Sequence, residues 1–143
     1  MLLDENTLFS DDQAITASAA STNYMDLQAG STPPGAPAAL VQKIGGGNDI
    51  PLLIQVTEAF ATLTSLTVTI QVDDNTSFSS ATTVASSHAV PAASLVAGYQ
   101  FPLVTLPNTV NERYVRLYYT VAGSNATAGT ITASIATGLQ TNG

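Results

Sequence analysis

The side chains in this sequence that could do chemistry most directly are one histidine and the serines beside it. His88 is the only histidine, and Ser86 and Ser87 precede it. Together with Asp73 they supply the side-chain types of a Ser–His–Asp triad, in which the histidine accepts the proton of the nucleophile. The sequence has no Gly-x-Ser-x-Gly turn, which exposes such a nucleophile in many hydrolases. A hydrolase is therefore the weakest hypothesis, and we expect no catalytic residue.

Two short motifs could bind ions, and each has a simpler explanation. The run Asp73-Asp74-Asn75 offers oxygen ligands, but it lacks the repeated ligand spacing of a calcium loop and is typical of a turn. Residues 45–48 (Gly-Gly-Gly-Asn) lack the Lys-Ser/Thr pair of a phosphate-binding loop. The chain has no cysteine, which excludes disulfides and thiolate metal sites. We expect no metal and no cofactor.

Tyr114, Arg116 and Tyr118 alternate along the sequence and would share one side of a strand. With Arg113 they resemble a surface on which nucleic-acid bases stack. The chain has only three Lys and Arg residues and a net charge of −7, which excludes a partner held through its phosphates. Two interpretations stay open for this face: the solvated side of a half-buried sheet, or a protein-binding patch, because Tyr and Arg are favoured at interfaces.

The composition describes a folded domain with few charges. The chain has 143 residues and 45% apolar residues, which fits one domain and excludes disorder. Charged residues make up 9% of the chain, against about 25% in an average soluble protein. Acidic residues stand near the start, where a signal peptide would have a basic and then an apolar stretch. We expect synthesis in a cytoplasm without secretion, and no membrane contact.

Hydrophobic residues alternate with polar ones along most of the chain, which predicts strands. The clearest predicted strands place their apolar rows at residues 50–56, 66–72, 99–103, 115–121 and 131–135, with weaker strands at 14–19, 24–28 and 82–87. The two weak strands near the start could form a hairpin across residues 20–23, and residues 91–98 could hold one helical turn. About eight strands in this length predict a single all-β domain, an antiparallel sandwich of the jelly-roll type. An immunoglobulin-like topology is the structural alternative.

Residues 29–49 interrupt this pattern. They contain Pro33, Pro34 and Pro37, then a short apolar piece with Leu40, Val41 and Ile44, and then three glycines. The prolines favour an extended conformation, and a loop of this length is usually functional or disordered. We interpret it as an arm with an apolar centre that docks on something, or as a surface excursion packed on its own sandwich. The protein-interface candidates are Pro33, Pro34, Leu40, Val41, Ile44, Tyr114, Arg116 and Tyr118.

Several segments in order along the chain resemble the capsid cement (decoration) proteins of short-tailed bacteriophages. These segments are residues 8–16 (LFSDDQAIT), 63–68 (LTSLTV), 71–75 (QVDDN), 78–80 (FSS), 91–95 (PAASL), 98–103 (GYQFPL), 113–123 (RYVRLYYTVAG) and 128–133 (AGTITA). The resemblance implies a jelly-roll protein on the outer capsid surface, made in the host cytoplasm, which clamps major capsid protein subunits together. It also implies a small homo-oligomer, for which we favour a dimer and keep a trimer open, and it implies no catalytic residue.

A carbohydrate-binding jelly roll, such as an adhesion module on a virion, is the hypothesis from another class. Such sites often stack sugars on exposed aromatic rings, and Tyr99, Tyr114 and Tyr118 are the candidates here. The absence of tryptophan weakens this alternative. The sequence thus predicts a non-enzymatic capsid cement protein, with glycan binding as the alternative.

Overall fold

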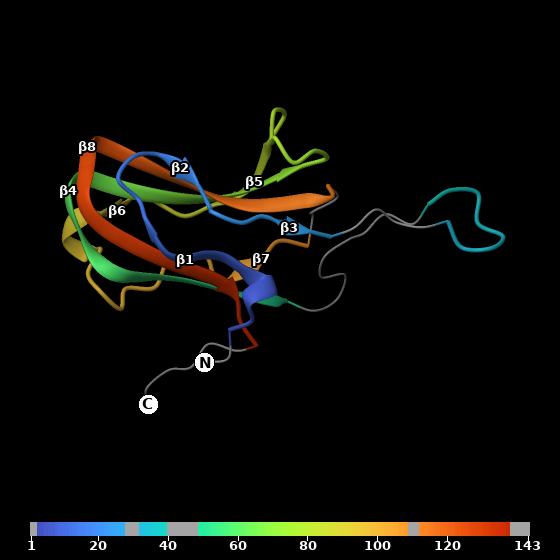
Figure 1. Cartoon of the computed structure of the whole chain (residues 1–143), viewed down its shortest axis with the longest axis horizontal. Coiled ribbons are helices and arrows are strands. Elements are labelled where there is room, and N and C mark those ends of the chain that lie inside the picture. The colour runs from blue at the N-terminus through green and yellow to red at the C-terminus, as the bar shows by residue number, and fades with distance from the viewer. Residues whose placement is uncertain (1–2, 28–31, 40–48, 109–111, 138–143) are drawn as a thin grey trace.

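Two long antiparallel strands, β4 (Ile50–Asp73) and β8 (Tyr114–Ile135), pair along almost their whole length and form the centre of the fold (Figure 1). The structure is a computed structural model that describes residues 3–27, 32–39, 49–108 and 112–137. Shorter strands flank the long pair: β1 (Leu8–Ala14), β2 (Ala19–Ala20), β3 (Met25–Asp26), β5 (Thr82–Ser86), β6 (Val90–Pro91) and β7 (Thr105–Leu106). The sheet order is β1-β8-β4-β5, and all pairings are antiparallel.

The two long strands bend together, and the bend folds their sheet onto itself. Their register shifts four times between Val56 and Ser65, and in Figure 1 both ribbons turn at the same end of the molecule. Thr62 has a positive φ of 73° there, and its hydroxyl donates to the carbonyl of Asn125 on β8. Gly129 has a φ of 132°. Such irregularities bend and twist paired strands, so one pair of strands contributes to both layers of a sandwich.

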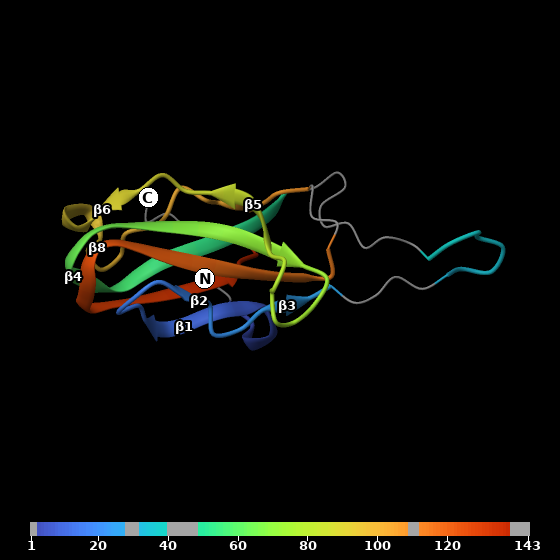
Figure 2. The ribbon, with the colours of Figure 1, turned by 90° about the horizontal axis from the view of Figure 1, so that it is seen from above.

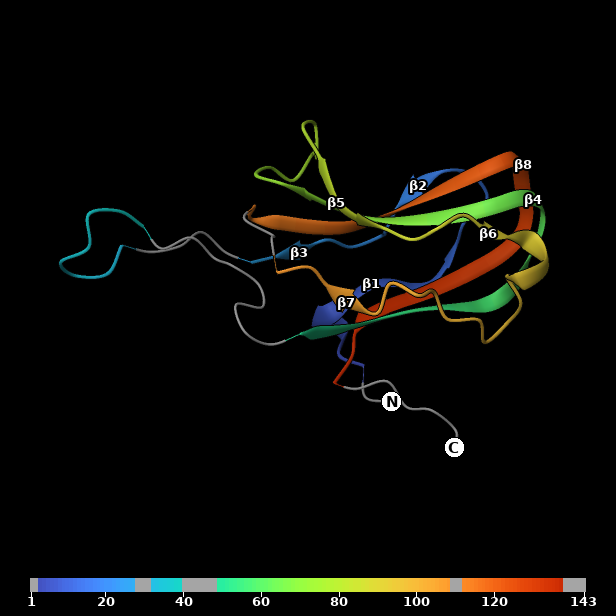
Figure 3. The same ribbon diagram turned by 180° about the vertical axis from the view of Figure 1, so that it is seen from behind.

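The pairing partners define the two layers. Layer one contains β1, the C-terminal half of β8, the N-terminal half of β4, and β7. Layer two contains β2 and β3, the N-terminal half of β8, the C-terminal half of β4, and β5 and β6. Figures 2 and 3 show the same arrangement from above and from behind.

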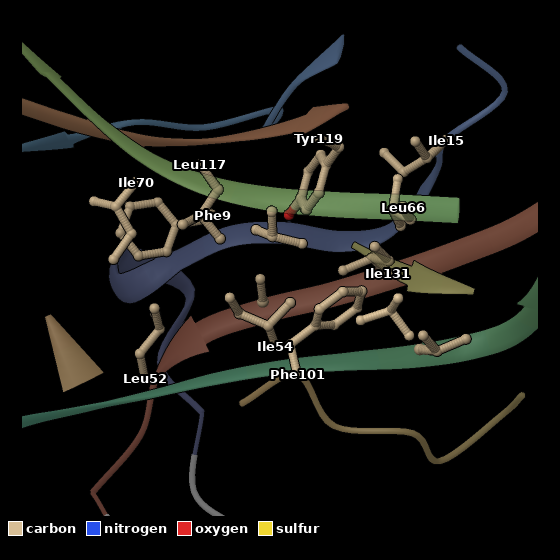
Figure 4. Packing of buried hydrophobic residues seen from close by; sticks show 14 of the residues in the cluster. Phe9, Ile15, Leu52, Ile54, Leu66, Ile70, Phe101, Leu117, Tyr119 and Ile131 are labelled. Carbon is tan, nitrogen blue, oxygen red and sulfur yellow. The ribbon is translucent and has the colours of Figure 1, made fainter. Parts of the chain in front are cut away.

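The core lies between these layers and confirms the predicted apolar rows. From layer two, Leu66, Ile70 and Leu117 face the interior, and Figure 4 shows Ile54 and Ile131 of layer one below them. Phe9 and Ile15, on and just after β1, close one side, and Phe101 closes another. These side chains are at most 2% exposed. Burial on this scale supplies the main stabilising free energy of such a domain.

The all-β antiparallel sandwich of about eight strands is confirmed, but several predicted boundaries are wrong. The rows at 50–56 and 66–72 belong to the single strand β4, and those at 115–121 and 131–135 to β8. Predicted strand 14–19 is mostly a bend, because β1 ends at Ala14 and β2 holds only two residues. The predicted hairpin across 20–23 does not form: β2 and β3 each pair with β8, whose edge in layer two is otherwise unpaired.

Residues 98–104 form an irregular ribbon instead of the predicted strand 99–103. They follow the edge of β4 in layer one, where the Val56 amide donates to Tyr99 and the Phe101 amide donates to Ile54. The predicted helical turn is confirmed as the 3-10 helix η2 (Ala92–Ser94), and a second 3-10 helix, η1 (Glu5–Thr7), precedes β1. No helix in the described parts of the chain is long and apolar enough to span a membrane.

Candidate protein interface

Arginine and aromatic side chains gather on the outer face of layer two, at the end where β3 leaves the sheet. This surface includes both arginines of the chain and three of its five tyrosines. We call it the arginine–tyrosine patch, and it consists of Tyr24, Phe78, Arg113, Tyr114, Arg116 and Tyr118.

Strand alternation positions the centre of the patch. Along β8, Val115, Leu117 and Tyr119 are 0% exposed and face the core. Tyr114, Arg116 and Tyr118 are half-buried on the opposite face, as the sequence predicts. The structure therefore brings these three predicted interface residues together.

Arg116 lies over two aromatic rings. Its guanidinium carbon lies 4.2 Å from the ring centre of Phe78 and 5.7 Å from that of Tyr118. Its Nε donates to Oε1 of Gln71 on the neighbouring strand β4, at 2.9 Å. Burial lowers the pKa of Arg116, against the opposing effects of Tyr118 and Asp73. A guanidinium that is held over a ring and by a hydrogen bond loses little freedom when a partner covers it, which favours binding.

Tyr24 and Phe78 extend the patch from two loops. Tyr24 precedes β3, is 47% exposed, and meets Tyr114 edge to face at 5.5 Å and Phe78 at 6.1 Å. Phe78 is 7% exposed although it does not belong to the core cluster between the layers. It is covered from outside, by Arg116 and Tyr24.

Asp73 fixes the loop that carries Phe78. Its Oδ2 accepts from the Ser80 amide at 2.8 Å, and its Oδ1 accepts from the Asn75 amide at 3.2 Å. Burial opposes ionisation of Asp73, but these hydrogen bonds outweigh it and lower the pKa of the carboxyl below its ordinary value. The predicted turn at 73–75 is thus present, and its carboxylate is engaged in holding the loop where Phe78 takes a φ of 51°.

Arg113 borders the patch and joins it to β3. Its Nε and Nη2 donate to the two carboxylate oxygens of Asp26, each at 2.8 Å. The hydrogen bond to Asp26 raises the pKa of Arg113 above its ordinary value. Its guanidinium carbon also lies 4.9 Å from the ring centre of Tyr114. A bidentate pair of this kind fixes the orientation of the guanidinium.

Of the predicted arm at residues 29–49, the structure describes residues 32–39 and Asp49, and Leu40, Val41 and Ile44 lie outside the described residues. Residues 32–39 lie apart from the sandwich, beyond the end that carries β3 (Figures 1 and 2). The chain turns within this stretch, at residues 33–36. The Ala36 amide donates to the Pro33 carbonyl at 3.0 Å, and Gly35 has a φ of 86°. Pro followed by a glycine of positive φ is the pattern of a type II turn.

The remaining sequence candidates are dispersed. His88 is exposed, and Ser87 is buried, where its hydroxyl donates to the His88 carbonyl and accepts from the Val68 amide. The Ser86 hydroxyl likewise donates to a backbone carbonyl. Tyr99 packs edge to face on Phe101 in layer one, away from Tyr114 and Tyr118. Within the described ranges, no three His, Cys, Asp or Glu side chains are grouped so that they could hold a metal ion.

Sequence reasoning missed Tyr24 and Phe78 as members of the patch. Neither belongs to the alternating row of β8, and both are brought to it by loops. The signal for Phe78 was a large apolar residue inside a run of polar turn residues. Such a residue must either reach the core or cover another surface.

Comparison with known proteins places the chain in a family without specifying an activity. A search of curated proteins gives no match. The family model described as Bbp16 matches residues 9–135, which includes both layers of the sandwich and the arginine–tyrosine patch. The protein is therefore a member of the Bbp16 family.

Proposed function

We propose that this protein is a non-enzymatic capsid cement protein, which binds the outer surface of a phage capsid and bridges neighbouring major capsid protein subunits. Membership of the Bbp16 family suggests a phage-associated protein and supports this setting. The ordered resemblance of the sequence to capsid decoration proteins of short-tailed phages points the same way.

One observation carries the proposal: the sandwich has two separate candidate contact surfaces at one end. The arginine–tyrosine patch lies on the outer face of layer two, and the turn at residues 33–36 lies beyond the same end (Figure 1). A bridging protein needs at least two contacts. Joined contacts reinforce each other through their effective concentration, so that neither has to be strong alone.

The electrostatics also suit a capsid exterior. The chain carries a net charge of −7, and its polar strand faces consist mainly of Thr, Ser and Gln. An acidic protein is repelled by packaged DNA. Surfaces with few charges lose little hydration free energy when broad interfaces cover them, and interface cores are depleted of charged residues.

The proposal is tested on particles of the virus that encodes the chain. The protein should be present in purified particles in a fixed ratio to the major capsid protein, and it should bind shells that lack it. Deletion of residues 31–47 should reduce that binding and leave the sandwich folded, as measured by circular dichroism. If the protein is found only free or only in tails, the proposal is refuted. If the deletion variant binds shells as well as the full chain does, the arm takes no part in capsid binding.

Glycan binding remains the second candidate function, favoured by one observation. A shallow pocket of about 520 Å³ lies beside the patch and is lined by Glu5, Asn6, Leu8, Thr22, Asn23 and Tyr24. Polar side chains beside an exposed aromatic ring are the groups that a sugar requires. A glycan array distinguishes the two functions: a hit that Tyr24→Ala abolishes would favour this one, and an array without hits would remove it.

A further inference from the structure

We propose that the shallow pocket between η1 and residues 22–24 binds a neutral pyranose sugar and discriminates against sugars that carry a carboxylate. This selectivity rests on glycan binding, the second candidate function, and does not depend on capsid binding. Among the described residues that line the pocket, only Tyr24 also belongs to the arginine–tyrosine patch.

The first wall of the pocket is the 3-10 helix η1, which lies at the same end of the sandwich as β3 (Figures 1 and 2). Asp4 caps this helix. Its Oδ1 accepts from the Asn6 amide at 2.9 Å, and its carbonyl accepts from the Thr7 amide at 2.9 Å. The cap therefore fixes the backbone of Glu5 and Asn6, the two helix residues that line the pocket.

The opposite wall, residues 22–24, is tied to β1. The Asn23 amide donates to the Phe9 carbonyl at 2.9 Å, and the Asn23 side-chain amide donates to the Leu8 carbonyl at 3.3 Å. Both walls are thus held by hydrogen bonds before any ligand binds. A site that is already ordered loses less conformational entropy on binding.

The lining combines apolar surface with groups that exchange hydrogen bonds with hydroxyls. Leu8 is half-buried and Tyr24 is 47% exposed, so both can pack against the C–H groups of a sugar ring. In the described part of the chain, the Glu5 carboxylate and the hydroxyls of Thr22 and Tyr24 have no hydrogen-bond partner. A carboxylate accepts, and a hydroxyl both donates and accepts. The hydroxyls of a sugar would therefore find partners of both kinds.

The shape of the pocket suits one exposed ring. Its volume of about 520 Å³ lies within the usual range of small-molecule sites. Because the pocket is shallow, most of the ligand stays in water, and each site should bind weakly. Many copies on one particle would compensate, since linked sites reinforce each other.

Charge decides which sugars fit. Glu5 lines the pocket and Asp4 precedes it, whereas no Lys or Arg of the described residues is in the lining. A carboxylate on the sugar would meet a like charge with no cation to offset it. A neutral sugar avoids this repulsion, and its hydroxyls can donate charge-assisted hydrogen bonds to Glu5.

The test is a titration of the free full-length chain, labelled with 15N, with four methyl glycosides. They are the β-D-glucoside, the β-D-galactoside, and the corresponding glucuronide and galacturonide, in which a carboxylate replaces the terminal hydroxymethyl group. We expect a neutral glycoside to shift the amide signals of Asn6, Leu8 and Asn23. Its uronide should bind at least about fivefold more weakly, the ratio that one close like-charge contact gives in water.

Two variants with the same change in charge show whether Glu5 makes this selection. Glu5→Gln should weaken binding of the neutral glycoside and reduce its advantage over the uronide. Asp11→Asn is the control, because Asp11 is an exposed acid on β1 that does not line the pocket, and it should leave both affinities unchanged. The amide spectrum of each variant shows directly that it is folded.

The possible failures are distinguishable. Equal or tighter binding of the uronide, an unchanged preference in Glu5→Gln, or signal shifts confined to other surfaces would overturn the proposal and leave glycan binding itself standing. If none of the four glycosides binds, the proposal is also overturned, and the glycan array then decides separately whether the protein binds any sugar.

Discussion

Tyr119 connects the two layers beneath the patch, and replacing it with phenylalanine gives a quantitative test of the fold. Its side chain is 0% exposed, and its hydroxyl lies 2.8 Å from the Ser10 hydroxyl on β1. Ser10 in turn donates to Oε1 of Gln13 at 2.7 Å, because that oxygen only accepts. The single proton of Ser10 is thereby used, so Tyr119 is the donor in the bond between them.

Tyr119→Phe should therefore lower the free energy of unfolding by little more than the contribution of one hydrogen bond. Ser10 keeps Gln13 as its acceptor and is not left without a partner. A neutral buried hydrogen bond contributes about 1 kcal/mol to the free energy of unfolding. For a domain of this size, that loss lowers Tm by roughly 3–4 °C near neutral pH.

The difference in the free energy of unfolding between the wild-type protein and Tyr119→Phe should vanish at alkaline pH. Burial raises the pKa of Tyr119 above its ordinary value of 10.0. Above pH 10.0 the unfolded chain releases the proton of this tyrosine, whereas the folded chain keeps it. The native state then binds more protons than the unfolded state, so the free energy of unfolding falls as pH rises. The slope approaches about 1.4 kcal/mol per pH unit. The phenylalanine variant lacks this loss, so the two stabilities should become equal near pH 11, about where the lost 1 kcal/mol is matched.

The measurement is urea unfolding followed by circular dichroism, on both proteins, from pH 7 to pH 11. Far-ultraviolet signal suits a chain that has no tryptophan. Stabilities that decline in parallel above pH 10 would refute the argument, because Tyr119 would then release its proton equally in both states. A cost of several kcal/mol at pH 7 would also refute it, by showing that Ser10 cannot keep its remaining partner.

Two further predictions concern the bend and the histidine. Gly129→Ala should lower the free energy of unfolding by about 2–5 kcal/mol, measured in thermal melts, because a Cβ there would lie 2.3 Å from the Phe60 ring and Gly129 has a φ of 132°. Gly98 also has a positive φ, but a Cβ there would meet open space, so the control Gly98→Ala should lose only about 1–3 kcal/mol. His88→Ala should leave stability, particle binding and oligomeric state unchanged, because His88 is exposed; loss of any measurable activity in that variant would revive the hydrolase hypothesis.

Much of the fold could be predicted because strand alternation is a local property. Successive side chains of a strand point to opposite faces whatever the strand pairs with. This alone places Leu66, Ile70 and Leu117 inside and Tyr114, Arg116 and Tyr118 on the opposite face.

The joins between strands were harder to predict. The stretch from Thr57 to Ser65 breaks the alternation and looks like a connection, yet β4 continues through it. Its irregular backbone is stabilised by β8, through contacts such as the Thr62 hydroxyl on the Asn125 carbonyl. Because these partners are 63 residues apart, no local pattern reveals them.

By itself the sequence determined the class of the fold, the faces of its strands and the scarcity of charge. Only the tertiary structure decided that Tyr24 and Phe78 join Arg116, and that the prolines at 33 and 34 form a turn apart from the sandwich. The physical reason is distance along the chain. A strand face follows from neighbouring residues, whereas a patch built from two loops and a strand depends on where the folded chain brings them together.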